Sequence, residues 1–108
     1  MTLRYMKIFV SVYEHNSITK AADVLHLAQP SVSLAIKEME EYYGTRFFER
    51  IGRHISPTGA GNELYRYALH IIELFDEMEQ KIKRLGSLRN TPYRCKHYDW
   101  HSYSPANA

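Results

Sequence analysis

The spacing of apolar residues predicts three amphipathic helices before residue 44. Apolar residues that recur every three or four positions share one face of a helix, and such faces pack on one another. Thr2 and Ser17 are suited to cap the first two helices. Pro30 suits the first turn of the third helix, and Gly44 ends it. The apolar faces comprise Leu3, Met6, Phe9, Val10 and Tyr13 in a first helix over about 3–15, then Ile18, Ala21, Ala22 and Leu25 in a short second helix, then Val32, Ile36, Met39 and Tyr43 in the third.

A tight turn and a short hairpin complete this first part of the chain. The turn of three to four residues starts at His26 and joins the second helix to the third. The stretch 47–57 predicts two very short extended segments around a turn that contains Gly52. We therefore expect a small wing after the third helix.

A longer fourth helix is predicted after Thr58, which is suited to cap it. Its apolar residues recur every seven positions, a spacing typical of helices that pair. Because the three short helices already bury one another, we expect this stripe to bind a second copy of the chain; packing against its own domain is the alternative. The predicted dimerisation residues are Leu64, Tyr67, Ala68, Ile71, Leu74, Phe75, Met78, Ile82 and Leu85.

The periodicity stops after about Leu88. The predicted organisation is a domain of three helices and a wing over 1–58, a linker helix over 59–88 and an irregular tail over 89–108. The tail contains Cys95, His97 and His101, whose spacing matches no tetrahedral metal site, so we expect no metal and no cofactor.

Composition sets broad limits only. The 108 residues suffice for one domain and an appended helix, and a hydrophobic share of 44% is ordinary for a soluble protein. The net charge of +2 neither requires nor excludes a nucleic-acid partner, so the positions of the charges matter more than their sum. Cys95 is the only cysteine, which favours a reducing compartment, and no apolar run is long enough to span a bilayer. We expect a cytoplasmic protein that does not bind membranes.

The third predicted helix has the chemistry of a DNA-reading helix. Two short helices joined by a tight turn allow the second helix to enter the major groove. Gln29 can bond an adenine edge, Ser31 and Ser33 can contact a base or a phosphate, and Lys37 can reach a phosphate or guanine. The alternative is that these polar residues form an ordinary solvent-exposed face of the helix.

Residues outside this helix extend the candidate surface. Ser17 and Thr19 can bond the sugar-phosphate strand, although both residue types also serve simply as caps. Arg50 and Arg53 flank the turn of the wing, where arginines reach phosphates or a narrow minor groove. Pairing with Glu49 is the alternative for both arginines.

Six motifs occur in a fixed order: 17–22 (SITKAA), 25–27 (LHL), 29–33 (QPSVS), 36–37 (IK) with Glu40, 48–50 (FER) and 58–61 (TGAG). In order and spacing they resemble the N-terminal region of LysR-type transcriptional regulators, over about residues 1–88. The resemblance implies a mainly α fold, a winged helix-turn-helix with a long C-terminal linker helix that pairs two subunits, and binding to an interrupted palindrome near a promoter. It also implies a recognition surface of Gln29, Pro30, Ser31, Ser33, Leu34 and Lys37, with Arg50 and Arg53 on the wing.

Three departures from the family pattern matter. Ala28 stands where the family often has Ser or Thr, so the third helix lacks the usual hydroxyl cap. Leu34 stands where many members have a polar or basic residue, which favours contact with a thymine methyl group or packing. Family members continue into an effector-binding α/β domain, whereas the segment from Arg94 looks unlike that continuation. We therefore expect a truncated chain with no small-molecule effector site and hypothesise a frame change or fused end.

The sequence thus predicts a transcription regulator that binds double-stranded promoter or operator DNA as a homodimer or tetramer. The alternative is a helical protein-interaction module that acts through the apolar stripe of 64–85. An enzyme is not expected, because no nucleophile, base and orienting group converge. The carboxylates Glu38, Glu40 and Glu41 are expected to be the exposed end of the third helix.

Overall fold

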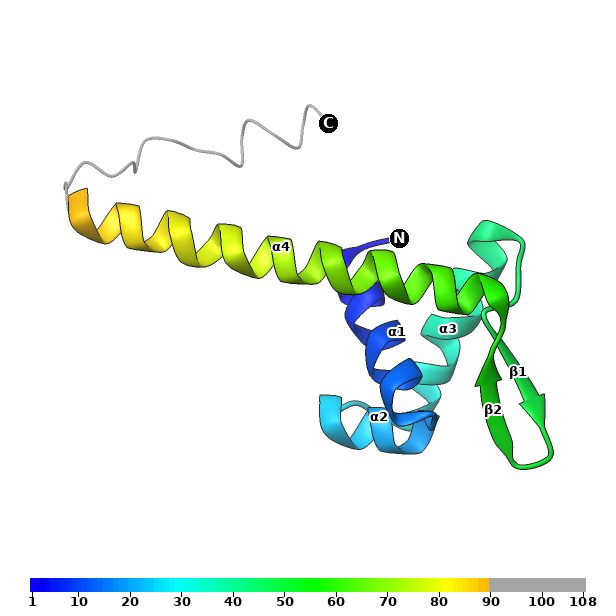
Figure 1. Ribbon diagram of the computed structural model, residues 1–108. Helices are drawn as coiled ribbons and strands as arrows, with labels where there is room; N and C mark the ends of the chain where they lie inside the picture. Colours follow the sequence, from blue (N-terminus) through cyan, green and yellow to red (C-terminus); the bar gives the residue numbers. More distant parts are fainter. Residues whose placement is uncertain (90–108) are drawn as a thin grey trace. The chain divides into compact units, whose positions relative to one another are not determined.

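The computed structural model describes residues 1–89, which form four helices and a two-stranded hairpin (Figure 1). The chain is mainly helical with a small wing, which confirms the predicted fold class. The predicted tail from residue 90 onward, with Cys95, His97 and His101, lies outside the described residues. The elements are α1 (Leu3–His15), α2 (Ile18–Leu25), α3 (Gln29–Tyr43), β1 (Phe48–Ile51), β2 (His54–Pro57) and α4 (Gly59–Arg89).

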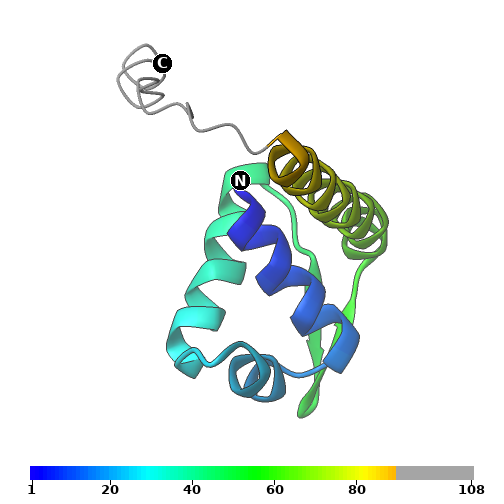
Figure 2. The ribbon, with the colours of Figure 1, turned by 90° about the vertical axis from the view of Figure 1, so that its left-hand side faces the viewer.

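The chain divides into two compact units, Met1–Phe75 and Asp76–Ala108. In the first unit, α1, α2 and α3 pack around one apolar core, in which Phe9, Val12 and Val32 are the largest fully buried side chains. In Figures 1 and 2, α2 lies at the opposite end of this bundle from the first turns of α4. Of the second unit, the described part is the remainder of α4.

Hydroxyl caps start three of the four helices, as the sequence predicts. The side chains of Thr2 and Ser17 accept hydrogen bonds from Tyr5 N–H at 3.3 Å and Lys20 N–H at 3.0 Å. Thr58 Oγ1 accepts from Gly61 N–H at 3.0 Å at the start of α4. The polar residues between the apolar stretches therefore set the helix boundaries.

The wing is an antiparallel pair in which Phe48 lies opposite Pro57 and Ile51 opposite His54. Gly52 adopts a φ of +65° in its turn, a conformation that suits glycine. Phe48 is buried in the core of the bundle, so the wing is held firmly at its base. Thr58 closes this base, because its hydroxyl donates to the Arg46 carbonyl at 2.6 Å.

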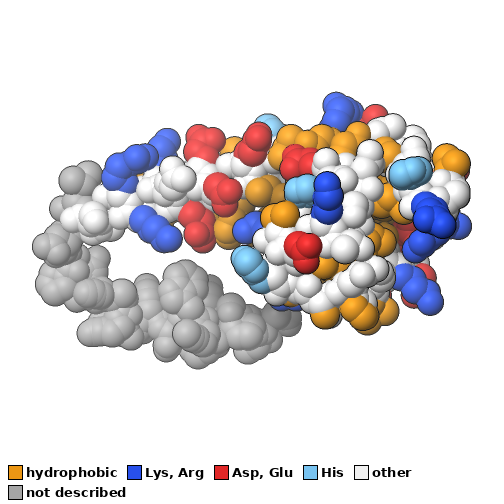
Figure 3. Space-filling view, turned by 90° about the horizontal axis from the view of Figure 1, so that it is seen from below, with side chains coloured by type: hydrophobic (Ala, Val, Ile, Leu, Met, Phe, Trp, Pro, Cys, Tyr) orange, Lys and Arg blue, Asp and Glu red, His pale blue; other side chains and the backbone are white. Residues whose placement is uncertain are grey.

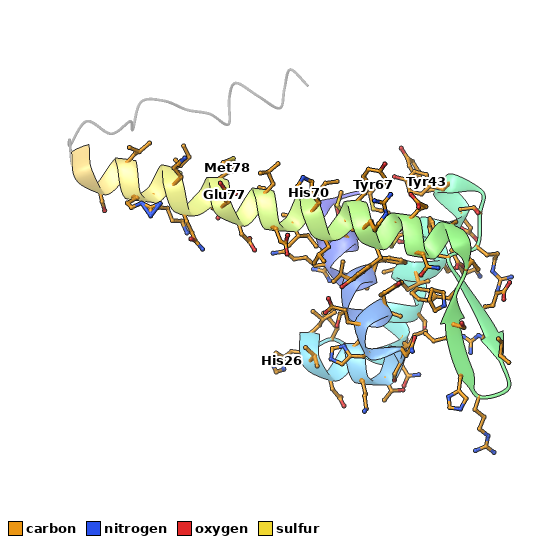
Figure 4. All side chains as sticks on the ribbon, viewed as in Figure 1. His26, Tyr43, Tyr67, His70, Glu77 and Met78 are labelled. Carbon is orange, nitrogen blue, oxygen red and sulfur yellow. The ribbon has the colours of Figure 1, made fainter. Side chains whose placement is uncertain are left out.

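Two expectations about buried residues are wrong. Tyr43, at the end of α3 (Figure 4), is 48% exposed, and its ring meets the rings of Tyr42 and Phe47 edge to face. Ala68 is 1% exposed and Leu64 packs partly buried on the same core. The first turns of α4 therefore pack on their own domain. Ala68 is not free to meet a second copy, whereas Leu64 is only partly buried and its place in the dimer surface stays a prediction.

The rest of the α4 stripe is exposed. Residues Tyr67 to Phe75 belong to the first unit, where Ala68 alone of the stripe is fully buried. No helix within residues 1–89 is long and apolar enough to cross a membrane. The exposed stripe members are Tyr67, Ile71, Leu74, Phe75, Met78, Ile82 and Leu85.

Candidate nucleic-acid interface

The start of α3, the helix α2 and the turn of the wing lie at the same end of the first unit (Figures 1 and 2). Three residues, His26 to Ala28, separate α2 from α3. His26 caps α2 in a left-handed conformation with φ of +59° (Figure 4), and its neighbour Leu27 donates to the Ala22 carbonyl at 2.9 Å. This turn is the tight connection that the sequence predicts, and it brings the start of α3 to the surface.

The two faces of α3 differ sharply. Val32, Ala35, Ile36 and Met39 are buried in the core, so the helix is fixed from behind. Leu34 is 54% exposed, which excludes the packing alternative for this side chain within the chain's described part. Over residues 29–37 the outer face thus offers hydrogen-bonding groups, one cation and one apolar side chain. The other exposed residues of this part are Gln29, Pro30, Ser31 and Lys37, with Ser33 half-buried beside them. Toward the end of α3 the exposed residues include two carboxylates, Glu38 and Glu41.

The N-terminus of α3 lacks the cap that the other helices have. Ala28 adopts the extended cap conformation, but no side-chain hydrogen bond caps this helix in the described structure, as its sequence predicts. No acidic residue lies in its first turn. The partial positive charge of a helix N-terminus is therefore not compensated by a neighbouring carboxylate of α3 itself.

The wing presents two arginines. Arg50 on β1 and Arg53 in the turn are exposed, and neither forms an ion pair among residues 1–89. The predicted alternative, a pairing with Glu49, is therefore absent from this part of the chain. Figure 3 shows Lys and Arg side chains gathered at the edge of the molecule that the wing occupies. A modest net charge is thus compatible with a local positive surface.

A depression of about 270 Å³ lies between α3 and the wing. Three cations and one carboxylate line it, and Ser33 lies at its wall. Arg46 is a cation that the sequence pattern did not single out, and its place directly before the wing was the available signal. The full lining is Ile18, Ser33, Ile36, Lys37, Glu40, Arg46, Phe48, Arg50 and Ile55.

Glu40 corrects a further expectation. Its side chain is 17% exposed, not the fully exposed carboxylate that the sequence predicts. Its Oε2 accepts from Phe47 N–H at 2.8 Å and Phe48 N–H at 3.2 Å, and its Oε1 lies 3.9 Å from Arg46 Nε. Backbone donors at the start of a strand need acceptors, and Glu40 supplies them from α3. The carboxylate therefore holds the wing next to α3.

Ser17 and Thr19 differ at the start of α2. Ser17 is half-buried and its Oγ caps the helix, so the capping alternative holds for it. Thr19 is exposed. The Ser17 hydroxyl retains its proton as a donor while its oxygen accepts, so a phosphate contact stays a prediction for both residues.

The described residues contain no group of three His, Cys, Asp or Glu side chains that could hold a metal. The tyrosine pKa shifts lie away from this surface. Tyr5 OH donates to Glu38 at 2.6 Å, and this hydrogen bond raises the pKa of Tyr5. The surface therefore offers neutral donors and acceptors beside exposed cations, of which Lys37, Arg50 and Arg53 form no ion pair among residues 1–89. Such groups are suited to contacts with double-stranded DNA.

Comparison with known proteins agrees with this geometry. Residues 3–62 match the family described as "Bacterial regulatory helix-turn-helix protein, lysR family". Similar relatives include the "RuBisCO operon transcriptional regulator" of Allochromatium vinosum, 39% identical over 82% of this chain and 31% of its own length. The "HTH-type transcriptional regulator BenM" of Acinetobacter baylyi is 40% identical over 84% of this chain and 30% of its own. The chain thus spans less than a third of these two relatives.

Solved structures show the same fold. The BenM_DBD chain in a complex with catB site 1 DNA has a TM-score of 0.78 and 40% identity, over 81% of this chain and 97% of that one. The chain in the CbnR_DBD–DNA complex has a TM-score of 0.75 and 29% identity, over 80% and 99%. By its family match, its relatives and its fold, the chain belongs to the lysR family of bacterial regulatory helix-turn-helix proteins.

Proposed function

We propose that the chain binds double-stranded DNA sequence-specifically, as a dimer, and thereby regulates transcription. One observation carries the proposal: α3 is anchored by a buried face while its polar N-terminal face is open, at the same end of the domain as two wing arginines that form no ion pair among residues 1–89. Rigid support behind an exposed polar face is what a recognition helix needs. The solved DNA complexes of BenM_DBD and CbnR_DBD, which share this fold, support it.

The proposed contacts divide by chemistry. Gln29 reads a base edge, Leu34 contacts a thymine methyl group, and Lys37 reaches a phosphate or guanine. Arg50 and Arg53 bind phosphates or the minor groove. The remaining proposed contacts are Ser17, Thr19, Pro30, Ser31 and Ser33.

The exposed stripe of α4 is the proposed dimer surface. Large apolar side chains such as Ile71, Leu74 and Met78 are costly to leave in water, and a second copy offers the matching stripe. We assign residues 1–58 to DNA binding and 59–88 to linkage and dimerisation. A protein-interaction module acting through 64–85 is the alternative that the same stripe favours.

The regulator is proposed to be non-enzymatic and cytoplasmic. The similar relatives named above are transcription regulators, which supports the first statement. The single cysteine in the chain supports a reducing compartment.

A titration of duplex DNA tests the function. The full chain is mixed with a fluorescent duplex from the intergenic region next to its gene, and with an unrelated duplex, at several salt concentrations. Gln29→Ala is expected to lose about 1–3 kcal/mol of discrimination between the two duplexes. Arg53→Ala is expected to weaken binding to both and to lower the salt slope by about 1.

Lys81→Ala, an exposed cation of α4 outside the proposed surface, is the matched control and should bind as wild type does. Salt-insensitive association without DNA binding would favour the interaction module. Equal binding by wild type, Gln29→Ala and Arg53→Ala would refute the assigned surface.

A further inference from the structure

Two tyrosines join the end of α1 to the first turns of α4. Tyr13 OH in α1 donates to Asn62 Oδ1 in α4 at 2.7 Å, and Tyr65 OH in α4 donates to Glu14 Oε2 in α1 at 2.7 Å. The two rings stack with centroids 4.0 Å apart and planes 6° from parallel. We name Tyr13, Glu14, Asn62 and Tyr65 the tyrosine clasp; all four belong to the unit Met1–Phe75.

The clasp resists rotation of α4. Each helix supplies one donor and one acceptor, so the two hydrogen bonds run in opposite directions between them. Asn62 and Tyr65 are three residues apart and share a face of α4, whereas Tyr13 and Glu14 are consecutive and diverge around α1. Hydrogen bonds need near-linear geometry. Two bonds that leave α1 in different directions therefore restrict both the rotation of the first turns of α4 about the helix axis and their translation along it. The stacking of the two rings further restricts the relative orientation of the two helices.

The exposed stripe begins on the opposite side of the same turns. Tyr67, Ile71 and Leu74 follow Tyr65 by two, six and nine residues, which at about 100° per residue places them roughly 180–240° around the helix from it. All three are exposed. The clasp that turns one face of α4 toward α1 therefore decides which way the start of the stripe points.

We propose that the tyrosine clasp positions the dimer surface relative to the recognition helix, and thereby sets the spacing of DNA half-sites that a dimer accepts. The inference rests on the proposed function. In a two-fold dimer the distance between recognition helices must match the distance between half-sites. A change in the rotation of α4 occurs in both copies and changes the distance between the recognition helices. If the clasp allows α4 to rotate more freely, the dimer therefore accepts a wider range of half-site spacings.

The test measures spacing preference. Selection from a randomised duplex pool first yields the preferred two-half-site duplex of the wild-type chain. Duplexes with one or two base pairs added or removed at the centre, and a single half-site duplex, are then titrated. The full chain is used as wild type, as the double variant Tyr13→Phe with Tyr65→Phe, and as Glu14→Gln. Phenylalanine keeps the stacked rings and removes both hydroxyls, whereas glutamine keeps an acceptor oxygen for Tyr65.

The double variant removes two hydrogen bonds in each copy and is expected to lose at least about 5-fold of the preference for the best spacing, the equilibrium factor of one net hydrogen bond. Its affinity for the half-site duplex should stay at the wild-type value, and Glu14→Gln should retain the wild-type order of spacings. An unchanged spacing preference would overturn the inference. So would an equal loss on half-site and full duplexes, because the hydroxyls would then act only on the fold. A wild-type chain that selects no sequence would overturn the proposed function, and this inference with it.

Discussion

Both α3 and α4 have an apolar stripe; that of α3 is buried except for Tyr43, whereas most of that of α4 is exposed. Val32 and Ile36 of α3 are 0% and 6% exposed. Leu74, Met78 and Leu85 of α4 are 54%, 47% and 53% exposed. The stripe of α3 therefore stabilises the fold of one chain, whereas the exposed part of the α4 stripe is available to stabilise an assembly.

The same contrast occurs within α4. Ala68 is buried and Leu64 packs on the core, while Ile71 three residues beyond Ala68 is exposed. Ala68 therefore belongs to the domain, and the stripe residues from Ile71 onward belong to the proposed dimer surface. Substitutions on the two sides of this boundary should affect different measurements.

The largest expected effect is on the buried stripe of α3. Ile36→Ala removes methyl groups from the core and should lower the free energy of unfolding by about 2–5 kcal/mol. Denaturant unfolding at fixed protein concentration measures it. Leu34→Ala, on the exposed face of the same helix, is the control and should cost far less. Equal losses would mean that the two faces of α3 are not distinct.

A substitution in the exposed stripe of α4 should weaken the dimer rather than the fold of one chain. Leu74→Asp places a charge on the proposed dimer surface and should raise the dimer dissociation constant by about 10-fold or more, the equivalent of one buried leucine. Sedimentation velocity over a concentration series measures this, and circular dichroism should show the helices retained. Gln80→Asp, exposed and off the stripe, is the control. A Leu74→Asp chain that stays dimeric would place the dimer surface elsewhere.

Tyr65, in the first turns of α4, allows a pH-dependent test of the contact between α4 and α1. Its hydrogen bond to Glu14 raises the pKa of Tyr65 from 10.0 to about 12, with smaller contributions from burial and from Tyr13 and Glu73. Because the folded pKa lies above the unfolded one, the stabilisation is fully present below about pH 10 and is lost as the pH rises toward about 12. Tyr65→Phe should therefore cost about 1 kcal/mol at pH 8, and this difference should shrink above pH 10.

Denaturant unfolding at pH 8 and pH 11 checks this expectation. Tyr42→Phe is the matched control, since Tyr42 is exposed and its hydroxyl forms no hydrogen bond among residues 1–89. A Tyr65→Phe cost that stays constant with pH would show that the phenol proton contributes nothing.

The smallest expected effect is at the start of α3. Ala28→Ser supplies the missing hydroxyl in a backbone conformation already suited to a cap, and should raise the free energy of unfolding by about 0.5–1 kcal/mol. Thr2→Ala, which removes the cap of α1, is the converse and should lower it by a similar amount. No gain from Ala28→Ser would mean that the first turn of α3 is already satisfied.

Local signals explain how much of the fold could be predicted. Helix starts followed from hydroxyl caps at Thr2, Ser17 and Thr58, and the wing followed from a glycine between two short extended segments. These features act within a few residues, so a sequence contains them directly. The outer face of α3 was predictable for the same reason, since a buried stripe on one side of a helix defines the other side.

What the amino-acid sequence determined by itself is the periodicity: which residues share a face, where each helix begins and ends, and which polar groups stand at the start of α3. Only the tertiary structure decided what covers each face, because that depends on residues far apart in the chain. In the tertiary structure Ala68 lies in the core, and Glu40 accepts hydrogen bonds from the backbone at the start of the wing. Tyr13 also stacks on Tyr65. No local pattern encodes such contacts, since their geometry exists only once the helices have packed.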